Sequence, residues 1–139
     1  MIDPQEAVIR FLSNDAELKA IVDTRVAAKH RYGVGWTVGT AGLMVRLDGG
    51  PVDLYVPMQA LRYEVRCYAA SPVEAMRIWK RLVAVSRETQ RVRVTVSDGT
   101  ALLYRFIQDS GPSQLYDDDI KMDCVLSFFS AAVAEESCQ

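Results

Sequence analysis

The chain has 139 residues, of which half are hydrophobic and about a quarter are charged, the composition of an ordinary globular protein. This length predicts a single domain, residues 1–139, that can bury a sizeable core. A formal net charge of −2 argues against a chain-wide electrostatic attraction to nucleic acid. Because no run of about 18 apolar residues occurs, neither a membrane-spanning helix nor a membrane partner is expected.

The first predicted elements are two helices. Asp3-Pro4-Gln5-Glu6 is typical of a capping box with proline in the first turn, and Asn14 is expected to cap a second, short helix that ends near residue 23. Residues 25–29 are interpreted as a short extended segment. The helical interpretation depends on a stripe of apolar residues at helical spacing: Ala7, Val8, Phe11, Leu12, Leu18, Ile21 and Val22.

A glycine-rich stretch separates these helices from the first long strand. Residues 30–42 contain four glycines and are interpreted as a long loop. The alternation of residues 43–47 predicts a strand, which Gly49-Gly50-Pro51 ends. Residues 52–56 are expected to form a turn or a short edge strand.

The segment from Leu61 to Val85 predicts a strand followed directly by a helix. Apolar and polar residues alternate over 61–68, which is typical of a half-buried strand. Ser71-Pro72-Val73-Glu74 is a further capping box. The helix that follows is expected to bury one face, made of Met76, Trp79, Leu82 and Val83.

The last part of the chain predicts strands joined by short connections. Ser97-Asp98-Gly99 is a hairpin signal, residues 111–119 are interpreted as a loop, and residues 131–139 as a frayed tail. The strands are expected at residues 91–96, 101–108 and 120–130. The fold class is therefore α+β: a two-layer sandwich of a mostly antiparallel four- to five-stranded sheet with two helical regions packed on one face.

The sequence offers no catalytic, cofactor-binding or metal-binding motif, and an enzyme is not expected. His30, the only histidine, lies between two cations without an orienting partner. The glycine-rich stretch lacks the Gly-Lys-Ser/Thr ending of a phosphate-binding loop. The spacing of Asp117, Asp118 and Asp119 is not that of a calcium loop, and three cysteines without CxxC spacing are interpreted as free thiols.

Charge is unevenly distributed along the chain. Residues 1–108 carry 15 Lys and Arg against 11 Asp and Glu, whereas residues 109–139 carry one lysine against seven acids. Basic and acidic regions in one subunit are suited to head-to-tail contacts between copies. An unevenly charged, solvated surface is the alternative interpretation.

The predicted central helix has a basic face, formed by Arg77, Lys80, Arg81 and Arg87. A solvated outer face is the usual explanation for such a pattern. A surface for nucleic acid or anionic membrane is a second, and contact with the acidic segment of a neighbouring subunit is a third.

The opening helix at Asp3-Pro4, the strand at Tyr63–Ala69 and the helix that starts at Ser71 follow one another in a characteristic order. In this order the chain resembles the tail-terminator, or tail-completion, proteins of long-tailed bacteriophages. The resemblance covers nearly the whole chain in element order. It depends on the opening Asp-Pro-x-x-Ala-Val helix, on Tyr63-Glu64-Val65-Arg66-Cys67-Tyr68-Ala69 and on the helix start at Ser71-Pro72-Val73-Glu74-Ala75, with residues 16–26 between them.

The resemblance implies a structural virion protein, located in the tail or neck and in the host cytoplasm during assembly. It implies a ring, typically a hexamer, that caps the tail tube, ends tube polymerisation and joins the tail to the head connector. The implied partners are further copies of the chain, the tail tube protein and the connector or head-closure protein. Genomic DNA would pass through the lumen without specific binding, and no cofactor is implied.

Candidate subunit-interface or lumen residues follow from exposure and charge. Aromatic residues of predicted loops are candidate contact anchors, because aromatics are enriched in interface cores. The candidates are Trp36, Tyr55, Arg77, Lys80, Arg81, Tyr116, Asp117, Asp118 and Asp119. Two alternatives stay open: another neck component, such as a head-closure or adaptor protein, and a small ligand-binding α+β module.

Overall fold

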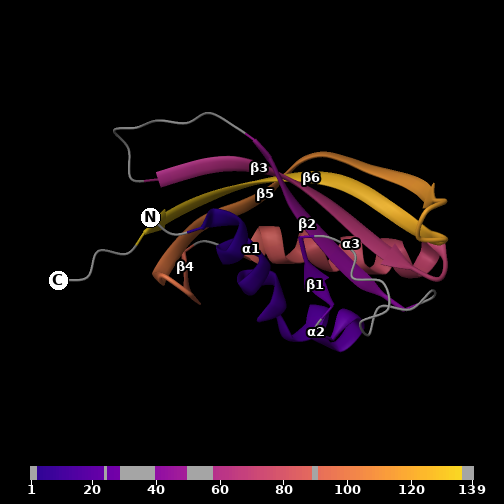
Figure 1. Ribbon diagram of the computed structural model, residues 1–139, viewed down its shortest axis with the longest axis horizontal. Coiled ribbons are helices and arrows are strands. Elements are labelled where there is room, and N and C mark those ends of the chain that lie inside the picture. Colours follow the sequence, from indigo (N-terminus) through magenta and orange to yellow (C-terminus); the bar gives the residue numbers. More distant parts are fainter. Residues whose placement is uncertain (1–2, 24, 29–39, 50–57, 89–90, 136–139) are drawn as a thin grey trace.

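The computed structural model describes residues 3–23, 25–28, 40–49, 58–88 and 91–135. The described residues form three helices and one six-stranded sheet (Figure 1). The helices are α1 (Pro4–Ser13), α2 (Ala16–Val22) and α3 (Pro72–Glu88); the strands are β1 (Val26–Ala27), β2 (Gly42–Gly49), β3 (Met58–Ala69), β4 (Val92–Val96), β5 (Gly99–Asp117) and β6 (Met122–Glu135). No helix in the described ranges is long and apolar enough to cross a membrane.

The sheet is mixed but almost entirely antiparallel. Its strand order is β1-β2-β3-β6-β5-β4, and only the two-residue β1 runs parallel to its neighbour. The α+β class and the mostly antiparallel sheet are confirmed. The expected four- to five-stranded sandwich is wrong, because the sheet has six strands and is curled. Short β1 adds the sixth strand, and the irregular register of β5 favours bending and extra twist.

The main core lies between the helices and one face of the sheet. Buried side chains of α1, α2 and α3 meet the inward-facing residues of the strands, as expected for a two-layer arrangement. In β3 this face carries the alternate residues Leu61, Tyr63, Val65, Cys67 and Ala69, all buried. Phe106 of β5 stacks on Phe129 of β6, with ring centroids 4.6 Å apart.

Helix α3 begins where predicted but buries a different face. The Ser71 hydroxyl accepts a hydrogen bond from the Glu74 amide, as in the predicted cap. Ala75, Ile78, Leu82 and Val85 are buried, whereas Met76, Trp79 and Val83 are only partly buried. The apolar residues of this helix form two adjacent stripes. The stripe that is buried lies about one residue position around the helix from the stripe that was predicted.

The long hairpin of β5 and β6 replaces a predicted loop and part of a predicted frayed tail. Residues 111–119 were expected to be a loop, but β5 continues to Asp117, and residues 131–135, expected to fray, belong to β6. Gly111 and Pro112 remain within the strand because the register shifts between Ser110 and Ser113, and a bulge accommodates a residue that cannot donate to the ladder. The predicted edge strand at 52–56 lies outside the described residues.

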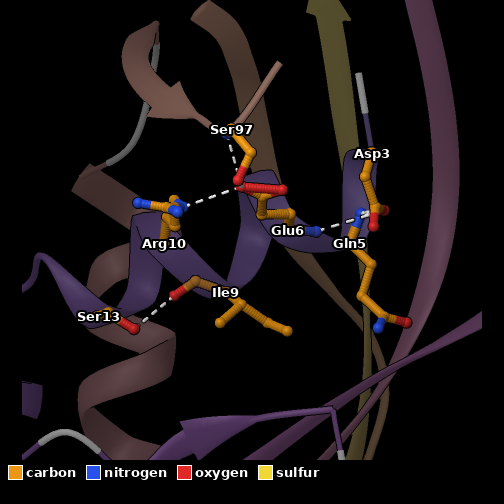
Figure 2. A network of polar contacts seen from close by, with 7 residues as sticks. All are labelled: Asp3, Gln5, Glu6, Ile9, Arg10, Ser13 and Ser97. Carbon is orange, nitrogen blue, oxygen red and sulfur yellow. Dashed lines mark hydrogen bonds and ion pairs between the residues drawn. The ribbon is translucent and has the colours of Figure 1, made fainter. Parts of the chain in front are cut away.

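Helix α1 joins the two sides of the curled sheet. Its cap is Asp3, whose carboxylate accepts hydrogen bonds from the backbone N–H groups of Gln5 and Glu6. The Gln5 side chain then accepts a bond from the Leu47 amide of β2, 2.8 Å away. Glu6 accepts from both the amide and the hydroxyl of Ser97 in the β4–β5 turn, each at 2.7 Å (Figure 2). One helix thus contacts both outer regions of the sheet.

These contacts correct two details of the predicted caps. Glu6 does not return to the Asp3 amide as in a full capping box, because Ser97 and Arg10 occupy its carboxylate (Figure 2). Asn14 is the C-cap of α1, and the neighbouring Asp15 caps α2 by accepting from the Leu18 amide. The strand-to-turn signal at Ser97-Asp98-Gly99 is confirmed.

Candidate functional site

Two of the predicted contact residues cannot be placed. Trp36 and Tyr55 lie outside the described residues, as do His30 and most of the glycine-rich stretch. The remaining candidates fall on two separate surfaces of the molecule. These are the outer side of α3, with Arg77, Lys80 and Arg81, and the end of the β5–β6 hairpin, with Tyr116 and the three aspartates that follow it.

The first surface is an open groove between α2 and α3. Its volume is about 400 Å³, within the range of small-ligand sites. Apolar side chains line it from both helices, and the predicted cations Arg77 and Lys80 are exposed beside them. The lining residues are Glu17, Ala20, Ile21, Arg77, Lys80, Arg81 and Ala84.

Arg81 belongs to an internal ion-pair cluster at this groove. Its guanidinium donates two hydrogen bonds to the Asp15 carboxylate, at 2.9 and 2.7 Å, in the bidentate geometry that Arg favours. Glu17 and Glu88 lie 3.5 and 3.6 Å from it. The bond from Arg81 is the largest influence lowering the pKa of Asp15, and the Asp15 bond raises the pKa of Arg81. Arg81 therefore fixes α2 to α3.

Arg77 and Lys80 differ from Arg81 in their surroundings. Both are exposed, and neither makes an ion pair with another side chain in the described ranges. The predicted basic face is therefore divided in two. The charge of Arg81 is paired within its own subunit, whereas the charges of Arg77 and Lys80 face solvent.

The second surface is the turn at the end of the β5–β6 hairpin. Asp117 accepts hydrogen bonds from the hydroxyl of Tyr68 at 3.0 Å and from the amides of Asp119 and Ile120 at 3.1 and 3.3 Å. Asp117 is therefore a structural residue, which holds the turn against β3. Asp118 and Asp119 are exposed.

This turn lies over a second, smaller core on the face of the sheet away from the helices. Consecutive residues of β3 point to opposite faces, so that Cys67 enters the main core and Tyr68 enters the second one. Met44, Met122 and Cys124 complete the second core, with Ile120 of the turn packed against it. Burial raises the pKa of both Tyr68 and Cys124, the latter to about 12, so this thiol is not a reactive one.

Charged residues on the same sheet face were missed as a set by the sequence prediction. Arg62 of β3 lies 3.6 Å from Asp48 of β2 and 3.3 Å from Asp109 of β5, and its guanidinium lies 4.1 Å from the centre of the Phe128 ring. The alternation of Arg62, Glu64 and Arg66 is the signal that could have indicated this charged row. These ion pairs link three different strands within one subunit.

The two candidate surfaces lie on opposite sides of the sheet. Helix α3 packs on the main core, whereas Ile120 of the turn packs on the second core. The structure therefore brings Arg81 together with Asp15, not with the aspartates of the turn. Among the described residues no group of three or more His, Cys, Asp or Glu side chains could hold a metal ion.

The chain matches no protein-family model and no curated protein. The two surfaces and the sequence resemblance are thus the basis for inferring a function. One surface is an apolar groove with two solvent-directed cations, and the other is a hairpin end with two exposed aspartates.

Proposed function

We propose that the protein is a structural component of a bacteriophage virion, which forms a ring on the tail tube, ends tube polymerisation and joins the tail to the head connector. A hexamer is the proposed ring. The observation that supports this function most is the separation of the basic groove and the acidic turn onto opposite sides of one sheet. A heterologous contact, the kind that closes rings, needs two different surfaces on each subunit.

The internal organisation of the subunit supports the same proposal. Ion pairs such as Arg81–Asp15 and Arg62–Asp109 hold elements of one chain together. Arg77, Lys80, Asp118 and Asp119 have exposed side chains, and they carry the opposite charges that steer subunits toward one another.

Tail assembly in the absence of the protein tests this function. Tubes are expected to grow beyond their normal length when the protein is withheld, and added purified protein is expected to restore uniform tubes. Electron microscopy of the tube lengths gives the measurement. Normal tube length without the protein would exclude a terminator.

Binding to isolated particles separates a terminator from the other neck components. A terminator is expected to bind the end of purified tail tubes. A head-closure or adaptor protein would instead bind the portal side of the head. Binding to heads alone would therefore replace the proposed function by that of an adaptor.

A further inference from the structure

The end of the β5–β6 hairpin exposes apolar as well as acidic side chains. Leu115 and Tyr116 are 44% and 58% exposed, and Asp118 and Asp119 follow them in the turn. These four residues are called the hairpin tip below. Exposed aromatic and aliphatic side chains inside a charged rim are the composition of an interface centre.

The groove between α2 and α3 has the complementary composition. Ala20 and Ile21 of α2 and Ala84 of α3 provide apolar lining, and Arg77 and Lys80 are the cations beside it. Its acidic member is Glu17, which lies 3.5 Å from Arg81. Within the described ranges Arg77 and Lys80 pair with no carboxylate of their own subunit.

A hairpin tip cannot fill the groove of its own chain. The tip lies at the end of the sheet where β3 passes into α3, whereas α2 lies well apart from it below the sheet (Figure 1). The hairpin end packs on the second core through Ile120 and Met122, on the sheet face away from the helices. The groove of another molecule is the partner that the geometry allows.

We propose that the hairpin tip of one copy docks into the α2–α3 groove of a second copy. The tip enters end-on, with Leu115 and Tyr116 on opposite faces of the hairpin and in contact with Ile21 and Ala84, and the aspartates of the tip meet the two cations. The contact is heterologous, so each copy offers a tip to one neighbour and a groove to the other. This inference rests on the proposed function, because it assigns the surfaces that join subunits of the ring.

The apolar and the charged contacts contribute differently to docking. Exposed ion pairs supply little free energy, so burial of Tyr116 and Leu115 is the main source of affinity. The charges of Asp118, Asp119, Arg77 and Lys80 set the orientation of docking and its rate. Loss of the apolar anchors should therefore weaken the contact at every salt concentration, whereas loss of the charges matters most at low salt.

Cross-linking between two differently labelled proteins tests the contact. One protein carries Gln114→Cys, at an exposed position beside the tip, and the other carries Ala84→Cys, both with Cys138→Ser. Because Cys67 and Cys124 are buried, a short bifunctional maleimide should react with the introduced thiols alone. Intact-mass analysis of the mixture is expected to show the mixed dimer in at least tenfold excess over a control pair, which corresponds to about 1.4 kcal/mol.

The control pair combines Gln114→Cys with Arg46→Cys. Arg46 is exposed on β2, outside the groove. Equal yields from the two pairs would overturn the proposed contact. A cross-link that also forms in the Cys138→Ser parent would show that the buried thiols react, and the pairs are then compared by peptide mapping of the linked residues.

Charge exchange gives a second, independent readout. Arg77→Glu with Lys80→Glu in the groove protein is expected to lower the mixed yield about tenfold. Asp118→Lys with Asp119→Lys in the tip protein should restore it, since opposite charges again face each other. Unchanged yields with both sets of variants would overturn the charge pairing.

Cross-linking and tube capping together distinguish failure of the proposed contact from failure of the proposed function. Tubes that are capped while the tip and groove do not cross-link would reject this contact and leave the proposed function in place. Specific cross-linking by a protein that never caps tubes would keep the contact and reject the function.

Discussion

Strand β5 contributes to two different regions of the molecule. Its side chains are buried at the helix-covered face of the sheet and exposed at the hairpin tip. Phe106 of β5 is fully buried and stacks on Phe129, whereas Leu115 and Tyr116, nine and ten residues further along β5, are about half exposed. The helices cover the first region, whereas the second is half open to solvent. Residues that stabilise the fold are therefore distinct from residues free to contact other molecules.

The largest expected effect is on the covered face. Phe106→Ala should reduce the free energy of unfolding by about 3–5 kcal/mol, because it leaves a cavity beside Phe129. Tyr116→Ala should change it by no more than about 0.5 kcal/mol. Urea unfolding followed by circular dichroism provides both values. Similar losses in the two variants would contradict the distinction between the regions.

The next effect concerns the connection of α2 to α3. Arg81→Ala removes both hydrogen bonds to Asp15, whose side chain, like that of Arg81, keeps only 16% of its exposure. We expect a loss of about 1–2 kcal/mol, between the values of exposed and buried pairs. Arg77→Ala is the matched control on the same helix and should be nearly neutral. Equal effects would show that Arg81 has no special structural role.

The same pair predicts a dependence of stability on pH. Arg81 lowers the pKa of Asp15 below its ordinary value of 3.8, so the stabilisation is complete above that value and is lost as the pH falls through the lower, folded-state pKa. The stability difference between the parent and Arg81→Ala should therefore be constant from pH 7 to about pH 5. It should shrink below pH 3.8. A difference that grows in acid would contradict the assignment.

A smaller effect separates the aspartates of the turn. Asp117→Ala should cost about 0.5–2 kcal/mol, the range for loss of a capping side chain, because it removes the acceptor of the Tyr68 hydroxyl and of two backbone amides. Asp118→Ala should lie within about 0.5 kcal/mol of the parent. Thermal unfolding of the two variants provides the comparison. A large loss from Asp118→Ala would make the exposed part of the turn structural.

The smallest effect is local and concerns α1. Ser97 lowers the pKa of Glu6 by donating its amide and hydroxyl to the carboxylate. Glu6→Gln should speed hydrogen exchange of the Ser97 amide relative to its intrinsic rate. In the parent this protection is present above pH 4.5 and is lost as the pH falls through the lowered pKa. Protection that is equal in parent and variant would contradict the contact between α1 and the β4–β5 turn.

Local signals in the sequence were sufficient for part of the fold. The start of α3 at Ser71, the alternation of β3 and the turn before Gly99 could be predicted because each depends on neighbouring residues. The continuation of β5 through Gly111 and Pro112 could not, since it depends on a bulge paired with β6. The buried face of α3 was misassigned because apolar residues occupy two adjacent stripes of that helix.

The candidate site could be predicted only as a set of charged residues. The ion pair of Arg81 requires Asp15, which is 66 positions away in the sequence. The structural role of Asp117 requires Tyr68, which is 49 positions away. Neither pairing leaves a mark in the local pattern. The fold therefore decides which of the charged residues are used internally and which remain at the surface.

The mass of the native particle, alone and on purified tail tubes, tests the central claim most directly. The account predicts a closed ring of identical subunits at the tube end, which the Leu115→Ala and Tyr116→Ala substitutions together dissociate while the subunit stays folded. A subunit that remains a monomer, both free and in the presence of tubes, would contradict it.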